Sequence, residues 1–102
     1  MSLVLKGVVF IFQPAVYFLA NKRNGTIYIG VTSNLPQRIT QHKMGQTDGF
    51  SKKYQTYRLV WYQYFETIAD AISAEKKLKN WNREWKIRLI EKDNPYWNDL
   101  EI

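Results

Sequence analysis

Two short runs of β-branched and aromatic residues, with an Asn-Gly pair between them, constrain the fold of this chain most strongly. The runs are Ala15–Ala20 and Thr26–Val31, and the pair is Asn24-Gly25. Asn-Gly between two β-rich runs is a strong signal for a two-residue hairpin turn. We therefore expect the domain to begin with two antiparallel strands joined by a tight turn.

The residues after this hairpin alternate between helical and strand patterns. Ser33 or Asn34 can cap a helix that ends near Gly45. Residues 46–57 are polar and basic, which indicates a surface loop, and residues 58–65 are aromatic and β-branched enough for a third strand.

Two further helices are expected near the C-terminus. Thr67 can cap the first, and the second runs from Asn82 to about Lys92, with Trp85 and Leu89 facing inward. The order β-β-α-β-α-α predicts an α+β fold, a three-stranded antiparallel sheet flanked by helices.

The chain has 102 residues, a length that suits one domain. We assign residues 14–95 to that domain. Residues 1–13 are an N-terminal extension, either an added strand or a segment without function, and residues 96–102 are a C-terminal tail.

The charge of the chain favours a polyanionic partner. Fifteen Lys and Arg against nine Asp and Glu give a formal net charge of +6. Every acidic residue lies at or after Asp48, so we expect the basic N-terminal half to face phosphates. Cysteine is absent, which excludes disulfides and thiolate chemistry, so a metal must bind oxygen or the single His42.

The apolar stretch Leu3–Ala20, with Lys6 near its start, loosely resembles a secretory signal. Gln13-Pro14 interrupts it, and the uninterrupted part is far shorter than the about 20 apolar residues that span a bilayer. We therefore expect a cytoplasmic protein with no membrane partner. We also expect a monomer that needs no obligate protein partner.

Glu75 occupies an unusual position on an apolar helical stripe. The same helical face carries Ala71 four residues before Glu75 and Ile72 three residues before it. It also carries Leu78, three residues after Glu75. A buried ionised carboxylate is costly unless it is paired or holds a cation. An ion pair with Lys79 and a role as metal ligand both stay open.

Arg38 and His42 lie four residues apart and therefore share a helical face with Leu35 and Ile39. A guanidinium suits a phosphate, and an imidazole can orient or accept a proton. The alternative is a solvated basic face with a surface histidine, which these residues by themselves favour. Tyr17 and Tyr28 are similarly ambiguous, because tyrosine is a common filler of strands.

Taken in order, these residues resemble the GIY-YIG nuclease signature. That signature has a Gly-Ile-Tyr triplet, about ten residues, a Tyr-Ile-Gly triplet, an Arg followed four residues on by a His, and a Glu on a later helix. The resemblance covers about residues 15–92. Within this family, the chain most resembles the small stand-alone bacterial members. These are single domains that are similar to the N-terminal domain of excision-repair nucleases. The matching residues are Ala15-Val16-Tyr17, Tyr28-Ile29-Gly30, Arg38, His42 and Glu75.

Two positions depart from the family pattern. Ala15 replaces the first glycine of the signature, which is the smallest substitution available. Many relatives carry an Asn about a dozen residues after the Glu, where this chain has Ile87. One element of the usual site therefore has no counterpart at this position.

The resemblance implies a metal-dependent endonuclease that hydrolyses nucleic-acid phosphodiester bonds, with DNA as the expected substrate and DNA repair as the expected role. It implies one divalent cation, Mg²⁺ with Mn²⁺ as substitute, bound by Glu75. Tyr17 is the expected general base, with Tyr28 hydrogen-bonded nearby and His42 as proton acceptor or relay. Arg38 would stabilise the transition state.

Further residues are expected to contact nucleic acid. Gly30 would let the backbone or substrate approach closely, although a strand-end bulge is an equally compatible interpretation. Trp81, Trp85 and Trp97 could stack on bases, but the helical spacing of the first two favours the core. Cations that would bind phosphates are Lys52, Lys53, Arg58, Lys76 and Lys79.

Two other functions remain as alternatives. The chain could be a catalytically silent nucleic-acid-binding module that keeps the fold, which the missing glycine and Asn favour. It could instead be a protein-interaction module that uses residues 60–65 as a partner surface.

Overall fold

The computed structural model describes residues 2–102 apart from residues 6–7, 12 and 47–48, and describes side chains from residue 13 onward except at residue 51. Three strands form its main sheet: β3 (Ala15–Ala20), β4 (Ile27–Thr32) and β5 (Arg58–Tyr64). They lie in the order β4-β3-β5, and both pairs are antiparallel. The predicted three-stranded antiparallel sheet is therefore confirmed, with β3 as its central strand.

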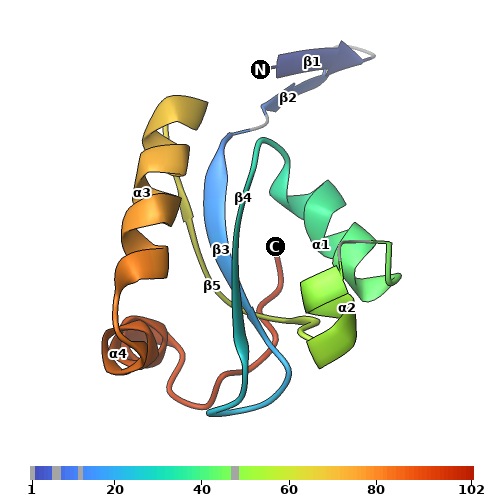
Figure 1. Cartoon of the computed structure of the whole chain (residues 1–102). Helices are drawn as coiled ribbons and strands as arrows, with labels where there is room; N and C mark the ends of the chain where they lie inside the picture. Colours follow the sequence, from blue (N-terminus) through green and yellow to red (C-terminus); the bar gives the residue numbers. More distant parts are fainter. Residues whose placement is uncertain (1, 6–7, 12, 47–48) are drawn as a thin grey trace.

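Helices cover both faces of this sheet (Figure 1). The helices α1 (Leu35–Lys43) and α2 (Gly49–Tyr54) lie on one face. The helices α3 (Ile68–Asn80) and α4 (Arg83–Asp93) lie on the other. This arrangement confirms the α+β fold and its β-β-α-β-α-α order.

Three elements add to that order. The strands β1 (Ser2–Leu5) and β2 (Val8–Ile11) pair with each other in a separate two-stranded sheet ahead of the domain. The short helix α2 lies within residues 46–57, where the sequence indicates only a loop. The expectation of a loop was therefore partly wrong. The helix has only six residues, too few for a clear helical pattern in the sequence.

The starts of the three longer helices follow from their capping residues. The side chain of Asn34 accepts a hydrogen bond from the backbone of Gln37 at 3.3 Å. Thr67 and Asn82 do the same for the third residue after each, at 3.1 and 2.9 Å. Each cap satisfies a backbone N–H that has no partner within its helix.

The β3–β4 connection differs from the predicted two-residue turn. Ala20 pairs with Ile27, so the whole of residues 21–26 forms the loop. Gly25 donates its backbone N–H to the carbonyl of Lys22 at 3.0 Å, and Asn24 takes a positive φ of 59°. The Asn-Gly pair therefore turns the chain beyond the end of the strand ladder rather than closing it directly.

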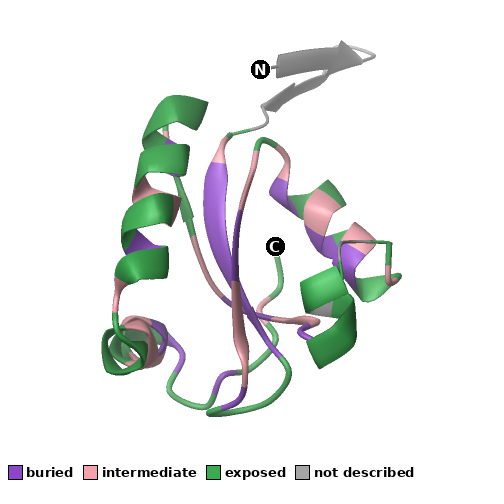
Figure 2. Ribbon diagram, in the orientation of Figure 1, coloured by how far each residue is buried: buried purple, intermediate pink, exposed green. Residues whose placement is uncertain are grey.

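The alternation of side chains along β3 divides the core into two layers, and all six residues of this strand are buried (Figure 2). One layer lies under α3 and α4, and the other lies under α1. Tyr17 belongs to the α1 layer, together with Leu35 and Ile39. Buried residues of the α3–α4 layer include Val16, Phe18, Ala71, Leu78, Ile90 and Trp97.

Some of the predicted inward-facing residues are not buried. Ile72 is 39% exposed and Trp85 is 50% exposed, while Ile90 is fully buried in its place. Helix α3 meets the core through Ala71 and Leu78, a stripe that passes to one side of Ile72. Trp85 packs edge-on against the half-buried Trp81 with ring centroids 5.7 Å apart, so only Trp81 joins the core.

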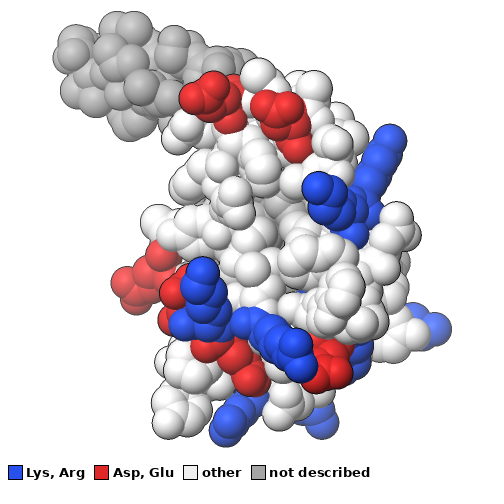
Figure 3. Space-filling model, turned by 90° about the vertical axis from the view of Figure 1, so that its left-hand side faces the viewer, with Lys and Arg blue, Asp and Glu red and all other residues white. Residues whose placement is uncertain are grey.

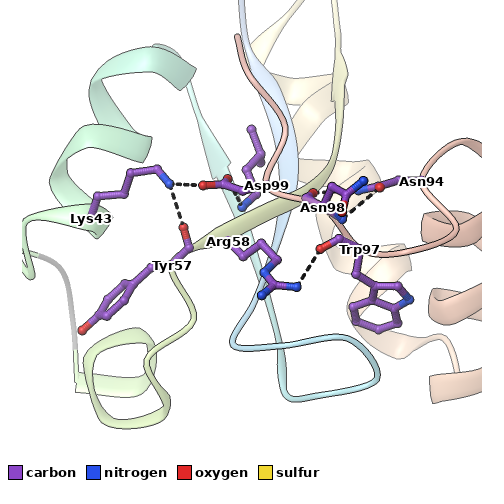
Figure 4. A network of polar contacts seen from close by, with 8 residues as sticks. Lys43, Tyr57, Arg58, Asn94, Trp97, Asn98 and Asp99 are labelled. Carbon is purple, nitrogen blue, oxygen red and sulfur yellow. Dashed lines mark hydrogen bonds and ion pairs between the residues drawn. The ribbon is translucent and has the colours of Figure 1, made fainter.

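The C-terminal segment returns to the sheet along β5 (Figure 4). Leu100 donates its backbone N–H to the carbonyl of Leu59 at 2.8 Å, and the carboxylate of Asp99 accepts from the N–H of Leu59 at 2.9 Å. Trp97 is fully buried, so the expectation that it stacks on bases is wrong. Its positive φ of 58° turns the chain back after α4, and its ring then fills the core.

Among the described residues, no helix is long and apolar enough to cross a membrane.

Candidate active site

Tyr17 and His42 form a buried hydrogen bond at the centre of the α1 layer. The hydroxyl of Tyr17 lies 3.0 Å from Nε2 of His42, and both side chains are fully buried. Tyr17 comes from the central strand and His42 from the last turn of α1. The interpretation of His42 as a surface histidine is therefore wrong, because its helical face turns onto the sheet.

Tyr28 completes a cluster of three rings. Its ring centroid lies 6.2 Å from that of Tyr17 and 5.3 Å from that of His42. In the register of the strands, Tyr28 is opposite Leu19 while Tyr17 is opposite Gly30. The two tyrosines are therefore diagonal neighbours on one face, a placement within reach of aromatic side chains.

Position 30 needs a residue without a side chain, because the ring of Tyr17 lies directly against it. A Cβ atom at Gly30 would lie 2.4 Å from both Cζ and the hydroxyl oxygen of Tyr17. The β3–β4 register runs unbroken through this pair, so the interpretation of Gly30 as a bulge is wrong. The glycine instead leaves room for the tyrosine to lie flat across the neighbouring strand.

Arg38 joins the cluster from the first half of α1. A hydrogen bond with Tyr17 raises the pKa of the half-buried Arg38 guanidinium, which stays charged. Arg38 also donates to the side-chain oxygen of Gln41 at 3.3 Å. The structure thus brings together four of the five residues that the sequence indicates for catalysis, Tyr17, Tyr28, Arg38 and His42.

Burial keeps Tyr17 in its neutral form. Desolvation raises the pKa of the Tyr17 phenol above its ordinary value of 10.0, and the hydrogen bond with Arg38 only partly opposes this rise. At neutral pH Tyr17 is therefore a phenol that shares a hydrogen bond with an imidazole, rather than a free phenolate.

The raised pKa of Tyr17 predicts how stability depends on alkaline pH. The folded protein keeps this proton where the unfolded chain has lost it, so the stabilisation is complete below about pH 10 and is lost as pH rises toward the folded-state pKa. The loss is at most about 1.4 kcal/mol per pH unit. We expect Tyr17→Phe to show a shallower decline in the free energy of unfolding above about pH 10. Urea unfolding across this range measures the decline, and a slope equal to that of the wild type would contradict the expectation.

Glu75, the fifth residue, lies on α3 and therefore on the opposite face of the sheet from Tyr17. Its side chain is 15% exposed and forms an ion pair with Lys79, in which Oε1 of Glu75 lies 3.3 Å from Nζ of Lys79. The predicted pairing with Lys79 is confirmed. Within the described residues, no group of three or more His, Asp or Glu side chains is arranged to hold a metal ion.

This donor set is compatible with one kind of metal ion. Mg²⁺ keeps several waters and commonly takes only one or two carboxylates together with substrate phosphates. Glu75 can supply one carboxylate if it exchanges Lys79 for the cation. A dedicated protein cage is not needed for such a site.

A pocket of about 330 Å³ along the edge strand β4 connects the two faces. Tyr28 of the ring cluster lines it, and so does Lys79, the partner of Glu75. One further lining residue, Phe50, was missed in the sequence, and Lys86 lines the pocket as well. Burial and the nearby Arg83 lower the pKa of Lys86. The signal of Phe50 was weak, because a lone Phe in a polar segment does not stand out.

The cations that were expected to contact nucleic acid are dispersed. Lys52 and Lys53 are exposed on α2, and Lys76 is exposed on α3. Arg58 instead donates to the carbonyl of Trp97 at 3.0 Å and is half-buried (Figure 4). On the side formed by α3 and α4, Lys and Arg alternate with Asp and Glu and form no continuous basic surface (Figure 3).

Comparisons with known proteins agree with this geometry. The family described as GIY-YIG catalytic domain matches residues 13–88. A UPF0213 protein of Pediococcus pentosaceus is 30% identical over 77 residues, covering 76% of this chain and 81% of that protein. A UPF0213 protein of Staphylococcus saprophyticus is 27% identical over 73 residues, covering 72% and 89%. The solution NMR structure of a UPF0213 protein of Bacillus halodurans shares 26% identity and a TM-score of 0.51, covering 80% of this chain and 86% of that one.

Proposed function

The chain belongs to the GIY-YIG family, and from this premise we propose that it is a metal-dependent endonuclease that hydrolyses phosphodiester bonds of nucleic acid, with DNA as its substrate. One observation carries the proposal: the buried hydrogen bond between Tyr17 and His42, with Arg38 and Tyr28 beside it. A buried phenol and imidazole beside a half-buried guanidinium form a costly arrangement for a structural core but a useful one for proton transfer and phosphate binding. We place this activity in the cytoplasm, in DNA repair.

We assign Tyr17 and His42 to one proton relay. Hydrolysis needs a group that removes a proton from the attacking water. The Tyr17 oxygen takes that proton while it passes its own proton to Nε2 of His42, 3.0 Å away. The relay avoids forming a free phenolate, which would cost about 4 kcal/mol at neutral pH even for an unburied tyrosine. The raised pKa of Tyr17 makes this concerted route more favourable than a preformed phenolate.

Arg38 and Tyr28 complete the assignment. The guanidinium of Arg38 remains charged beside Tyr17 and can stabilise negative charge that develops on the phosphate oxygens. Tyr28 lies against both Tyr17 and His42 and also lines the edge pocket. We infer that it orients the relay and forms the boundary between the relay and the bound strand.

Glu75 would hold the divalent cation, Mg²⁺ or Mn²⁺. When bound, the cation neutralises charge on the scissile phosphate and on the leaving oxygen. Without the cation, the ion pair with Lys79 compensates the charge of the Glu75 carboxylate. With the cation held by Glu75, Lys79 would be able to bind a phosphate in the pocket that it lines. Lys52, Lys53 and Lys76 supply further phosphate contacts, with a benefit that falls as salt rises. Gly30 and Arg58 would not contact nucleic acid themselves. Gly30 leaves room for the Tyr17 ring, and Arg58 holds the C-terminal segment through the carbonyl of Trp97.

The test is cleavage of labelled single-stranded, duplex and branched DNA with Mg²⁺, with Mn²⁺ or with a chelator. We expect cleavage only with the cations. Glu75→Gln should raise the Mg²⁺ concentration needed for half-maximal cleavage by about tenfold or more, because it removes the ligand charge. Glu84→Gln is the matched control, since Glu84 forms the same kind of ion pair with Arg88 on α4. Equal Mg²⁺ dependence in the two variants would contradict the assignment of Glu75.

A catalytically silent nucleic-acid binder is the second candidate. Ile87 packs against the core at the position where many relatives carry an Asn, so α4 offers no amide there. Binding that weakens with salt, without cleavage of any of the three DNA forms, would select this candidate.

A further inference from the structure

Two exposed aromatic residues of α2 lie beside the ring cluster and take no part in the proposed relay. The ring centroid of Phe50 lies 5.8 Å from that of Tyr28 and 4.8 Å from that of Tyr54. Tyr28, Phe50 and Tyr54 thus form a continuous row from the cluster to the surface, which we call the aromatic row. Phe50 is 45% exposed and Tyr54 is 41% exposed, so much apolar ring surface faces water at a cost.

The aromatic row borders the edge pocket. Tyr28 and Phe50 line this pocket together with Ile27 and Ile29 of β4. Its volume of about 330 Å³ is at the lower end of the range for small-molecule sites. The pocket therefore has room for one planar, nucleotide-sized group whose face rests on an aromatic ring.

Positive charge surrounds the row. Lys79 and Lys86 line the pocket, and none of the described residues that line it is acidic. Lys52 and Lys53 are exposed on α2, and the Lys53 ammonium lies 5.5 Å from the ring centroid of Tyr54. Aromatic faces for stacking, with ammonium groups around them, are the combination by which proteins hold unpaired nucleotides.

Resting on the proposed nuclease function, we propose that the aromatic row stacks one unpaired nucleobase of the strand that is cut, while Lys79 and Lys86 bind the phosphates that flank it. A paired base in a duplex is already covered on both faces by its neighbours. The row therefore takes a base from a single strand or one turned out of a duplex. Because every base has a π-face, the row confers a preference for unpaired structure and little preference for sequence.

A purely structural role for the row predicts a different result. Phe50 and Tyr54 lie four residues apart, and such a pair can stabilise the short helix by itself. In that case, removing a ring would weaken all nucleic-acid binding alike by disturbing α2. If the row stacks on a base, removing a ring should weaken binding of a strand that carries bases and should leave binding of a strand without bases nearly unchanged.

The experiment uses fluorescence anisotropy with a labelled single-stranded oligonucleotide and a matched one of equal length in which the bases are replaced by abasic sites. Chelator is present throughout, so no cleavage occurs. We expect the wild type to bind the base-containing strand about tenfold more tightly, the effect of one stacked base. Phe50→Leu should abolish most of this preference, and Phe50→Tyr, which keeps a ring, should retain it.

Two control variants separate stacking from charge. Tyr64→Leu removes a similarly exposed ring, 43% exposed, from the opposite edge strand β5 and should keep the wild-type preference. Lys53→Gln should weaken binding of both oligonucleotides alike and reduce the dependence on salt.

The outcomes distinguish the aromatic row from the nuclease. Equal binding of the two oligonucleotides by the wild type, or an equal loss on both in Phe50→Leu, overturns the aromatic row even if the protein cuts DNA. A base-dependent preference that Phe50→Leu abolishes supports the row even if no cutting is found. Absence of binding to either strand at low salt overturns both.

Discussion

Tyr17→Phe is expected to lower the rate of phosphodiester cleavage by about a hundredfold to ten-thousandfold, the usual contribution of a positioned proton-transfer group. The variant keeps the ring over Gly30 and removes only the hydroxyl that lies 3.0 Å from Nε2 of His42. Binding of nucleic acid should be nearly unchanged, because the substitution removes one neutral hydroxyl and leaves every positively charged side chain in place. Single-turnover cleavage and anisotropy on the same DNA measure the two effects separately.

The matched control is Tyr62→Phe. Tyr62 is the register partner of Tyr17 on β5 and belongs to the same layer of the core, so it loses a hydroxyl from the same sheet face. A similar rate loss in both variants would indicate damage to the sheet rather than loss of a proton relay.

The relay also predicts non-additive losses. If Tyr17 and His42 act on one proton, the double variant Tyr17→Phe with His42→Ala should cleave no more slowly than the slower single variant. Losses that multiply would show that the two residues act independently. The stability cost of Tyr17→Phe should be about 1 kcal/mol, the ordinary cost of losing one hydrogen bond.

Gly30→Ala is expected to combine a large loss of stability with a large loss of cleavage. The new methyl group would lie 2.4 Å from Cζ and the hydroxyl oxygen of Tyr17, far inside contact distance. The ring must therefore move, at a cost of about 1–3 kcal/mol for an overfilled core. Urea unfolding measures this cost, and cleavage should fall because the hydroxyl is drawn away from His42.

Gly49→Ala is the control for the substitution itself, because a Cβ at Gly49 would meet nothing within 4 Å. A second control replaces the ring. In a Tyr17→Leu background the colliding ring atoms are absent, so Gly30→Ala should become neutral or stabilise the strand by up to about 1 kcal/mol. A penalty of the same size in both backgrounds would mean that some other contact requires glycine at position 30.

Local features of the sequence determined most of the secondary structure. The strand Ala15–Ala20 follows from its apolar, β-rich residue types. That both of its faces are buried became evident only once its partners were known. Asn34, Thr67 and Asn82 act as helix caps because a short polar side chain reaches the backbone three residues on. The i,i+4 spacing likewise made the Glu75–Lys79 ion pair one of the two alternatives for Glu75, and the structure contains that pair.

The resemblance to the GIY-YIG signature indicated one site, and the order and spacing of Tyr17, Tyr28, Arg38 and His42 carry that resemblance. The spacing shows only that His42 shares a helical face with Leu35 and Ile39. It does not show whether that face packs on the sheet or lies in water. Docking of α1 through Leu35 and Ile39 decided it. The small size required at Gly30 became visible only when the strand register placed it opposite Tyr17.

Tertiary structure alone also decided the fate of the aromatic residues. Trp97 follows a helix end and looks like part of a tail, yet a left-handed turn returns it to the core, whereas Trp85 stays 50% exposed. Phe50 lies in a polar segment and gains a place beside Tyr28 only because α2 folds over the β4 edge. Residue type and period are properties of neighbours along the chain, whereas burial depends on partners distant in sequence. The sequence by itself therefore determined most of the elements and most of the candidate residues, and packing decided which side chains face the core and which face a substrate.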